Sequence, residues 1–145
     1  MFSKILELQR ISGKKDKASF IVDNTNDEVF VAIMKFLLDN TITTGIDVKK
    51  WDKCETEPST DIWNKCTTFT DTLDFVKENN TGRNEIVATL KALCETYFDK
   101  EIDFITYKQI MTKTLTVGVS DKTWNKLVAD ELKVPYSPYM GCQSY

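Results

Sequence analysis

The stretch NDEVFVAIMKFLL, residues 26–38, carries the pattern that decides the fold class. Its apolar side chains recur every three or four residues, which places them on one face of a helix. An asparagine suited to capping a helix stands at its start. The apolar positions are Val29, Phe30, Ile33, Met34, Phe36 and Leu37. Because similar patterns fill most of the chain, we predict an all-α fold, a single compact bundle of about six or seven short helices.

The other helices are predicted from the same spacing and from capping residues. The expected ranges are 5–11, 15–22, 70–76 (capped by Thr70), 84–98, 103–111 and 120–128 (capped by Ser120). Residues 52–69 are polar and contain Pro58, so we expect a loop or short turns there. No internal repeat of fixed period is visible. We predict a helical domain over residues 1–133 and an extended linker over residues 134–145.

Composition narrows the class of protein. With 145 residues, 41% hydrophobic content, five glycines and three prolines, the chain can bury a core and is poorly suited to a turn-rich all-β fold. No apolar run approaches the roughly 20 residues that span a bilayer, so we expect no membrane association. Nothing resembles a secretion signal, and a cytoplasmic location is expected.

The cysteines and histidines bear on metal binding and catalysis. The four cysteines lie far apart without a C-x-x-C pair, and the chain has no histidine. They are Cys54, Cys66, Cys94 and Cys142. This pattern favours free thiols over a zinc site. The absence of histidine also removes the most common general base.

Charge is distributed unevenly along the chain. The formal net charge is −3, and residues 51–103 contain twelve acidic residues against six basic ones. Residues 10–17 and 104–126 each contain four basic residues and one acidic residue. The negative total therefore hides two basic segments, and the local potential can differ in sign from the sum.

Both basic segments share a local pattern, ISGKKDK at residues 11–17 and VGVSDK at residues 117–122. Glycine permits close approach of a ligand to the backbone, helix-start amides carry partial positive charge, and lysines follow within one turn. This combination can hold a phosphate without reading its chemical context. The alternative is a pair of ordinary helix starts with solvated lysines. We expect Trp124 in the core, whereas Trp51 could cover a sugar or pack on the domain.

Other catalytic patterns are weak. Asp71 and Asp74 lie three residues apart and could hold Mg²⁺ on one side of a helix, but acids in a first helical turn commonly serve the helix itself. The chain contains no GxxxxGK[ST], no GxSxG and no K-x-D-G sequence.

Five stretches together resemble the N-terminal DNA-binding domain of ATP-dependent DNA ligases, most closely those of large tailed bacteriophages. They are KILELQRISGKKDKASFIVDN (4–24), IDVKKW (46–51), TFTDTLDFV (68–76), TLTVGVSDKTWNKL (114–127) and CQSY (142–145). The resemblance implies an all-helical module that grips nicked duplex DNA across the minor groove, mainly through phosphates, during DNA replication, repair and recombination.

The resemblance also implies site residues and partners. The DNA-contacting positions would be Gly13, Lys14, Lys15, Lys17, Gly118, Val119, Ser120, Lys122, Asn125 and Lys126. The partners would be nicked double-stranded DNA and the nucleotidyltransferase and OB domains of the parent ligase, with ATP and Mg²⁺ needed only by the full-length enzyme. This chain would be a monomer without catalytic residues, metal or cofactor of its own, in the host cytoplasm if phage-encoded.

Two alternatives come from other classes of protein. The acidic residues 51–103 could dock a basic partner, which would make the chain a protein-interaction module of a replication or repair complex. Asp71 and Asp74 could instead serve a small metal-dependent nuclease.

Overall fold

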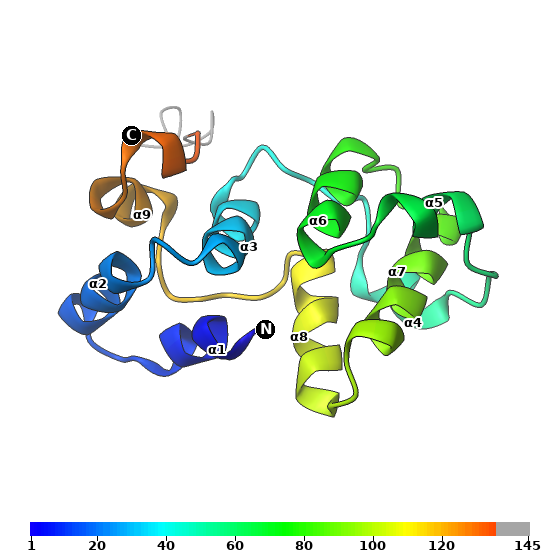
Figure 1. Ribbon diagram of the computed structural model, residues 1–145, viewed down its shortest axis with the longest axis horizontal. Helices are drawn as coiled ribbons and strands as arrows, with labels where there is room; N and C mark the ends of the chain where they lie inside the picture. Colours follow the sequence, from blue (N-terminus) through cyan, green and yellow to red (C-terminus); the bar gives the residue numbers. More distant parts are fainter. Residues whose placement is uncertain (136–145) are drawn as a thin grey trace. The chain divides into compact units, whose positions relative to one another are not determined.

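The computed structural model describes residues 1–135, and in that range it consists of helices joined by loops, without strands (Figure 1). The prediction of an all-α fold is confirmed. Nine α-helices and one 3₁₀ helix are described, more than expected, because residues 48–65 contain two six-residue helices. The helices group into two compact units, residues 1–42 with 116–135 of the described chain, and residues 43–115.

Unit 1 contains α1 (Ser3–Arg10), α2 (Lys14–Asp23), α3 (Glu28–Leu38), α9 (Asp121–Leu127) and the 3₁₀ helix Asp130–Leu132. The α1 helix packs on α2 and α3, and α2 packs on α9. The core of the unit centres on aromatic side chains. The Phe30 ring lies 6.0 Å from that of Phe20 and 6.4 Å from that of Trp124, centroid to centroid. Trp124 is fully buried, as predicted.

Unit 2 contains α4 (Val48–Lys53), α5 (Thr60–Lys65), α6 (Phe69–Glu78), α7 (Asn84–Tyr97) and α8 (Glu101–Met111). The α7 helix packs on α4, α5 and α8. Tyr107 is fully buried at the centre, with the rings of Trp51, Phe69 and Phe98 about 6 Å from its own. Trp51 therefore packs in the core of this unit rather than lying open to a ligand.

Helix starts follow local hydrogen bonding, and several differ from the sequence-based expectation. Asp27, not Asn26, caps α3 by accepting the Phe30 amide at 3.0 Å. Thr68, not Thr70, caps α6 in a reciprocal capping box with Asp71. Ser120 caps α9, as predicted. The two short helices α4 and α5 were not predicted, because six residues are too few for a helical period to be recognised.

The first residue of the predicted linker is packed within the helical structure. Val134, expected to begin the extended linker, is 4% exposed and is hydrogen bonded to α9. The expected CQSY stretch and Cys142 lie outside the described residues. Among the described residues, none of the helices has the length and apolar character needed to cross a membrane.

Candidate nucleic-acid interface

Unit 1 brings the two glycine-containing basic segments together. The Lys17 ammonium group on α2 donates to the carbonyl of Val117 at 3.1 Å, across a sequence separation of 100 residues. The same group donates to the carbonyl of Leu8 at 2.7 Å. A second link runs from the Gln9 side-chain amide to the carbonyl of Thr116 at 2.9 Å. Helices α1 and α2 are therefore linked to the loop before α9.

Gly118 lies at the point where the two segments meet. Its φ of +71° is in the left-handed region, where side-chain-bearing residues are strained. A Cβ at this position would lie 3.1 Å from the Lys17 nitrogen and 3.2 Å from its Cε. Gly118 is exposed, so its backbone is open to solvent beside a fixed ammonium group.

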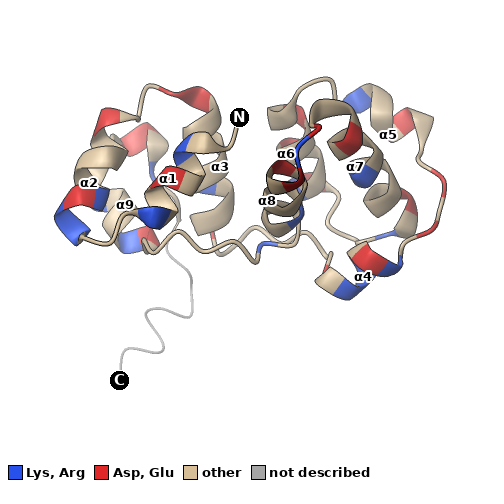
Figure 2. Ribbon diagram, turned by 90° about the horizontal axis from the view of Figure 1, so that it is seen from below, with Lys and Arg blue, Asp and Glu red and all other residues tan. Residues whose placement is uncertain are grey.

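Six of the predicted contact residues on α2, on α9 and in the loop before α9 are exposed. They are Lys14, Lys15, Gly118, Ser120, Lys122 and Lys126. The helices α2 and α9, which carry these lysines, pack on each other, and both bear Lys or Arg segments in Figure 2. Lys122 and Lys126 are four residues apart on α9 and so share one side of it. We call these six residues, together with Lys17, the unit 1 basic surface.

The other predicted contacts are less accessible. Asn125 is buried and its side chain is used inside unit 1: it donates to the Val134 carbonyl and accepts from the Val134 amide, both at 2.8 Å. It therefore does not belong to an exposed interface. Gly13, Val119 and Lys17 are half-buried. Two of the three N–H donors of Lys17 already serve backbone carbonyls, so its main role is to hold the two loops together.

Two acidic side chains lie within the same segments. Asp16 is exposed in the first turn of α2, between Lys15 and Lys17. Asp121, the first residue of α9, is 5% exposed, and one of its oxygens accepts the Lys122 amide at 2.9 Å. Both charges oppose that of the surface, but the exposed lysines Lys14, Lys15, Lys122 and Lys126 outnumber them.

Asp71, one of the two candidate metal ligands, is used in the cap of α6. Asp71 accepts hydrogen bonds from the Thr67 hydroxyl and the Thr68 amide as part of the α6 cap. The Thr67 bond is the main reason that the pKa of Asp71 lies below its usual value. Within residues 1–135, no group of three or more His, Cys, Asp or Glu side chains is arranged to hold a metal ion. Asp71 thus has a structural role that accounts for its position.

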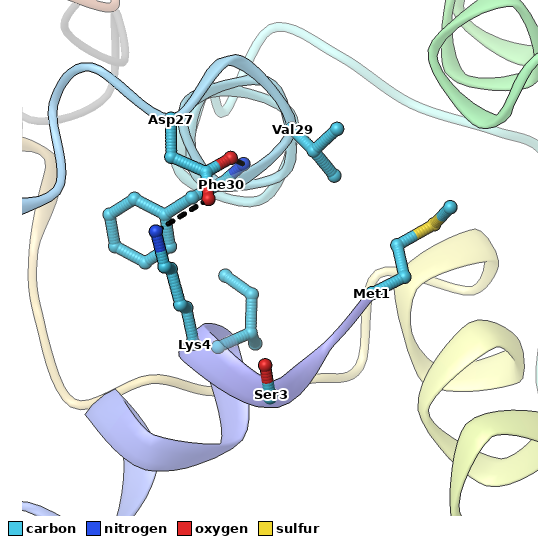
Figure 3. Close-up of a pocket in the computed structure, with 7 residues that line it drawn as sticks. Met1, Ser3, Lys4, Asp27, Val29 and Phe30 are labelled. Atoms are coloured by element: carbon cyan, nitrogen blue, oxygen red, sulfur yellow. Dashed lines mark hydrogen bonds and ion pairs between the residues drawn. The ribbon is translucent and has the colours of Figure 1, made fainter.

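A pocket of about 340 Å³ on unit 1 lies beside an ion pair (Figure 3). The Lys4 nitrogen is 2.7 Å from a carboxylate oxygen of Asp27, and the other oxygen of Asp27 caps α3. The hydrogen bond from Lys4 is the main cause of the lowered pKa of Asp27. Because the Lys4 ammonium group is already paired with Asp27, this pocket is a weaker candidate than the unit 1 basic surface.

The sequence contains a signal that the initial prediction missed. The nine residues Gly45–Lys53 reproduce the spacing of Gly118–Lys126: glycine first, a capping residue third, lysine fifth, tryptophan seventh and lysine ninth. The expectation of no internal repeat is therefore incomplete, because this short element occurs twice. Aligning the chain with itself around its glycine–tryptophan pairs would have found it.

Comparison with protein-family models, curated proteins and solved structures finds no match to this chain. The resemblance to the DNA ligases consequently stays a prediction.

Proposed function

We propose that the unit 1 basic surface binds the phosphate backbone of nicked duplex DNA without sequence specificity. The observation that carries this proposal is the bond from the Lys17 nitrogen to the Val117 carbonyl, because it joins the two glycine-containing basic segments. One such segment alone does not distinguish a binding surface from an ordinary helix start. Two of them on one unit, with exposed lysines, supply several positive charges that a chain of phosphates can contact together.

The chemistry of the surface favours a polymer over a small anion. Lys14 and Lys15 begin α2, whereas Lys122 and Lys126 extend along α9, so the positive charges are spread over two helices. Lysine provides charge and mobile donors without the planar geometry that reads base edges. Contacts of this kind fix register and affinity but carry no sequence information.

The same resemblance gives the proposed biological setting. The chain would be the DNA-holding part of an ATP-dependent DNA ligase, and the nucleotidyltransferase and OB domains of the parent enzyme would seal the nick. The sequence lacks a K-x-D-G segment, so the lysine that takes up AMP, and the need for ATP and Mg²⁺, would belong to the parent enzyme.

The test is a charge reversal on both loops, Lys15→Glu with Lys122→Glu. A matched control, Lys65→Glu with Lys77→Glu, makes the same charge change at two exposed lysines of unit 2. Binding to a fluorescent nicked duplex is measured by anisotropy over a salt series, on two unrelated sequences. If about five phosphates are engaged, log K of the wild type falls with log salt at a slope of about −4.5. Losing two contacts reduces this slope to about −2.7.

We expect the double variant to weaken binding at least tenfold on both sequences, while the control binds like the wild type. Equal binding by wild type and Lys15→Glu/Lys122→Glu, with both folded by circular dichroism, would contradict the proposal. If the wild type does not bind nicked DNA at low salt but does bind a basic protein partner, the interaction-module alternative is favoured.

A further inference from the structure

The element Gly118–Lys126 in unit 1 has a structural counterpart in unit 2, the stretch Gly45–Lys53. The leading glycines have φ values of +71° and +70°, the same left-handed conformation. The third residue caps the helix in each case: Ser120 accepts the amide three residues later at 3.2 Å, and Asp47 does so at 2.8 Å. Two stretches 73 residues apart in the chain therefore fold alike.

The likeness extends to the two faces of each short helix. The seventh residue is a tryptophan that faces the core, Trp51 with 7% exposure in unit 2. The fifth and ninth residues are lysines, and Lys49 and Lys53 are both exposed, as are their counterparts in α9. Each element thus presents a lysine pair to solvent from a helix that its tryptophan fixes.

Each glycine also lies close to a lysine amine. In unit 2 the Lys50 nitrogen donates to the carbonyl of Gly45 at 3.1 Å. A Cβ on Gly82, in the loop before α7, would lie only 2.0 Å from that same carbonyl oxygen and 2.9 Å from the Lys50 nitrogen. The corresponding lysine of unit 1, Lys17, bonds the carbonyl next to Gly118. A fixed ammonium group beside a left-handed glycine is therefore common to both units.

The surface around this crossing is basic and concave. A groove of about 300 Å³ is lined by Asp47, Lys49, Lys50, Lys53, Cys54 and Asn84. Arg83, adjacent to Gly82 and Asn84 in the chain, adds a fourth cation and is mostly exposed although it pairs with Glu85 at 2.6 Å. Exposed pairs of this type are weak, so a phosphate can compete for the guanidinium. The acidic middle of the sequence thus contains a local excess of positive charge.

We infer that Lys49, Lys53 and Arg83 form a second surface for the phosphate backbone of duplex DNA, on unit 2. The inference rests on the proposed function of unit 1, because DNA binding is assigned to the unit 2 element by its likeness to the element of unit 1. The chemistry that recognises the ligand is the same in both units: exposed lysines on one side of a helix, with a held ammonium group at a glycine turn. DNA would therefore be bound by two matched elements, one per unit, rather than by one.

The experiment removes charge from each element separately in the full chain. Lys49→Gln with Lys53→Gln tests unit 2, Lys122→Gln with Lys126→Gln tests unit 1, and Lys65→Gln with Lys77→Gln is the control for lost charge. Anisotropy with a fluorescent nicked duplex is measured from low to moderate salt. Each element pair should reduce the steepness of the log K against log salt plot by about 1.8, whereas the control leaves it unchanged. Binding at fixed salt should fall at least tenfold for each.

The outcomes separate the two proposals. A less steep plot of log K against log salt in both element variants supports both surfaces. A less steep plot in the unit 1 variant alone overturns the unit 2 inference and leaves the proposed function standing. If the unit 1 variant keeps the wild-type slope and only the unit 2 variant has a less steep one, the proposed function as stated is overturned and the inference loses its basis. Melting temperatures within about 3 °C of the wild type show that each variant is folded.

Discussion

Replacing Gly82 by alanine tests the close crossing of two backbone loops in unit 2. Gly82 has a φ of +68°, and an alanine Cβ there would lie 2.0 Å from the carbonyl oxygen of Gly45. The left-handed conformation costs a residue with a side chain about 1–2 kcal/mol. The overlap is with backbone, so it is relieved only if the two loops separate.

Separation of the loops breaks specific interactions. The side-chain amide of Asn80 donates a hydrogen bond to the Thr43 hydroxyl at 3.1 Å and so links the two loops. The Lys50 nitrogen, which donates to the Gly45 carbonyl, also lies close to Gly82. Each such bond contributes about 0.5–1.5 kcal/mol net. With the conformational term, we expect Gly82→Ala to lower the free energy of unfolding by about 3 kcal/mol. For a chain of this length that corresponds to a fall in Tm of about 10 °C.

The assay is thermal unfolding followed by circular dichroism at 222 nm and checked by calorimetry, with Gly13→Ala as the matched control. Gly13 also precedes a helix, but its φ is −90°, and an added Cβ would meet only the flexible Asp16 side chain, at 3.3 Å. The control should melt within about 2 °C of the wild type, since a compatible Gly→Ala change is nearly neutral or stabilising. A Gly82→Ala variant as stable as this control would refute the crossing.

Three further perturbations test other contacts. Asn125→Ala leaves the buried amide and carbonyl of Val134 without their partners, so urea denaturation should give a loss of about 2–4 kcal/mol; no loss would mean that Val134 is not held there. Lys17→Met keeps the aliphatic stem but removes two hydrogen bonds to carbonyls, one to Val117, and should cost about 1–3 kcal/mol in the same assay. The pKa of Asp71 is lowered from 3.8 in the folded state, so its stabilising effect is present above that pH and disappears as the pH falls through the folded-state value. The stability advantage of wild type over Asp71→Asn should thus vanish in acid, and an advantage that grows there would contradict the capping role.

Features decided by local pattern were predictable from the sequence. The helical class, the Ser120 cap and the burial of Trp124 all follow from spacing within one turn or two. The short helix α4 was missed because six residues do not display a period, although its Asp47 cap was available as a signal. A local pattern does not decide which of two adjacent polar residues caps a helix. Asp27 caps α3 with one carboxylate oxygen, and its other oxygen accepts a hydrogen bond from Lys4.

The candidate site was predictable only in part, for a different reason. The lysines were found from their spacing, and their exposure fits an amphipathic helix. Asn125 was predicted as a contact only from the resemblance to the ligase domain. Its side chain instead bonds Val134, nine residues away, and no pattern within α9 announces that contact. The junction at Lys17 depends on a pairing 100 residues apart, which composition and periodicity do not encode.

Unit 1 is built from both ends of the described chain, whereas unit 2 is one continuous stretch, residues 43–115. During synthesis, α1, α2 and α3 leave the ribosome long before the segment that carries Trp124, so Phe30 lacks its aromatic neighbour in the nascent chain. Unit 2 can fold meanwhile, since all its helices are already present. Because of this order of emergence, unit 1, which contains the lysine-bearing junction, can be completed only after all of unit 2 has been synthesised.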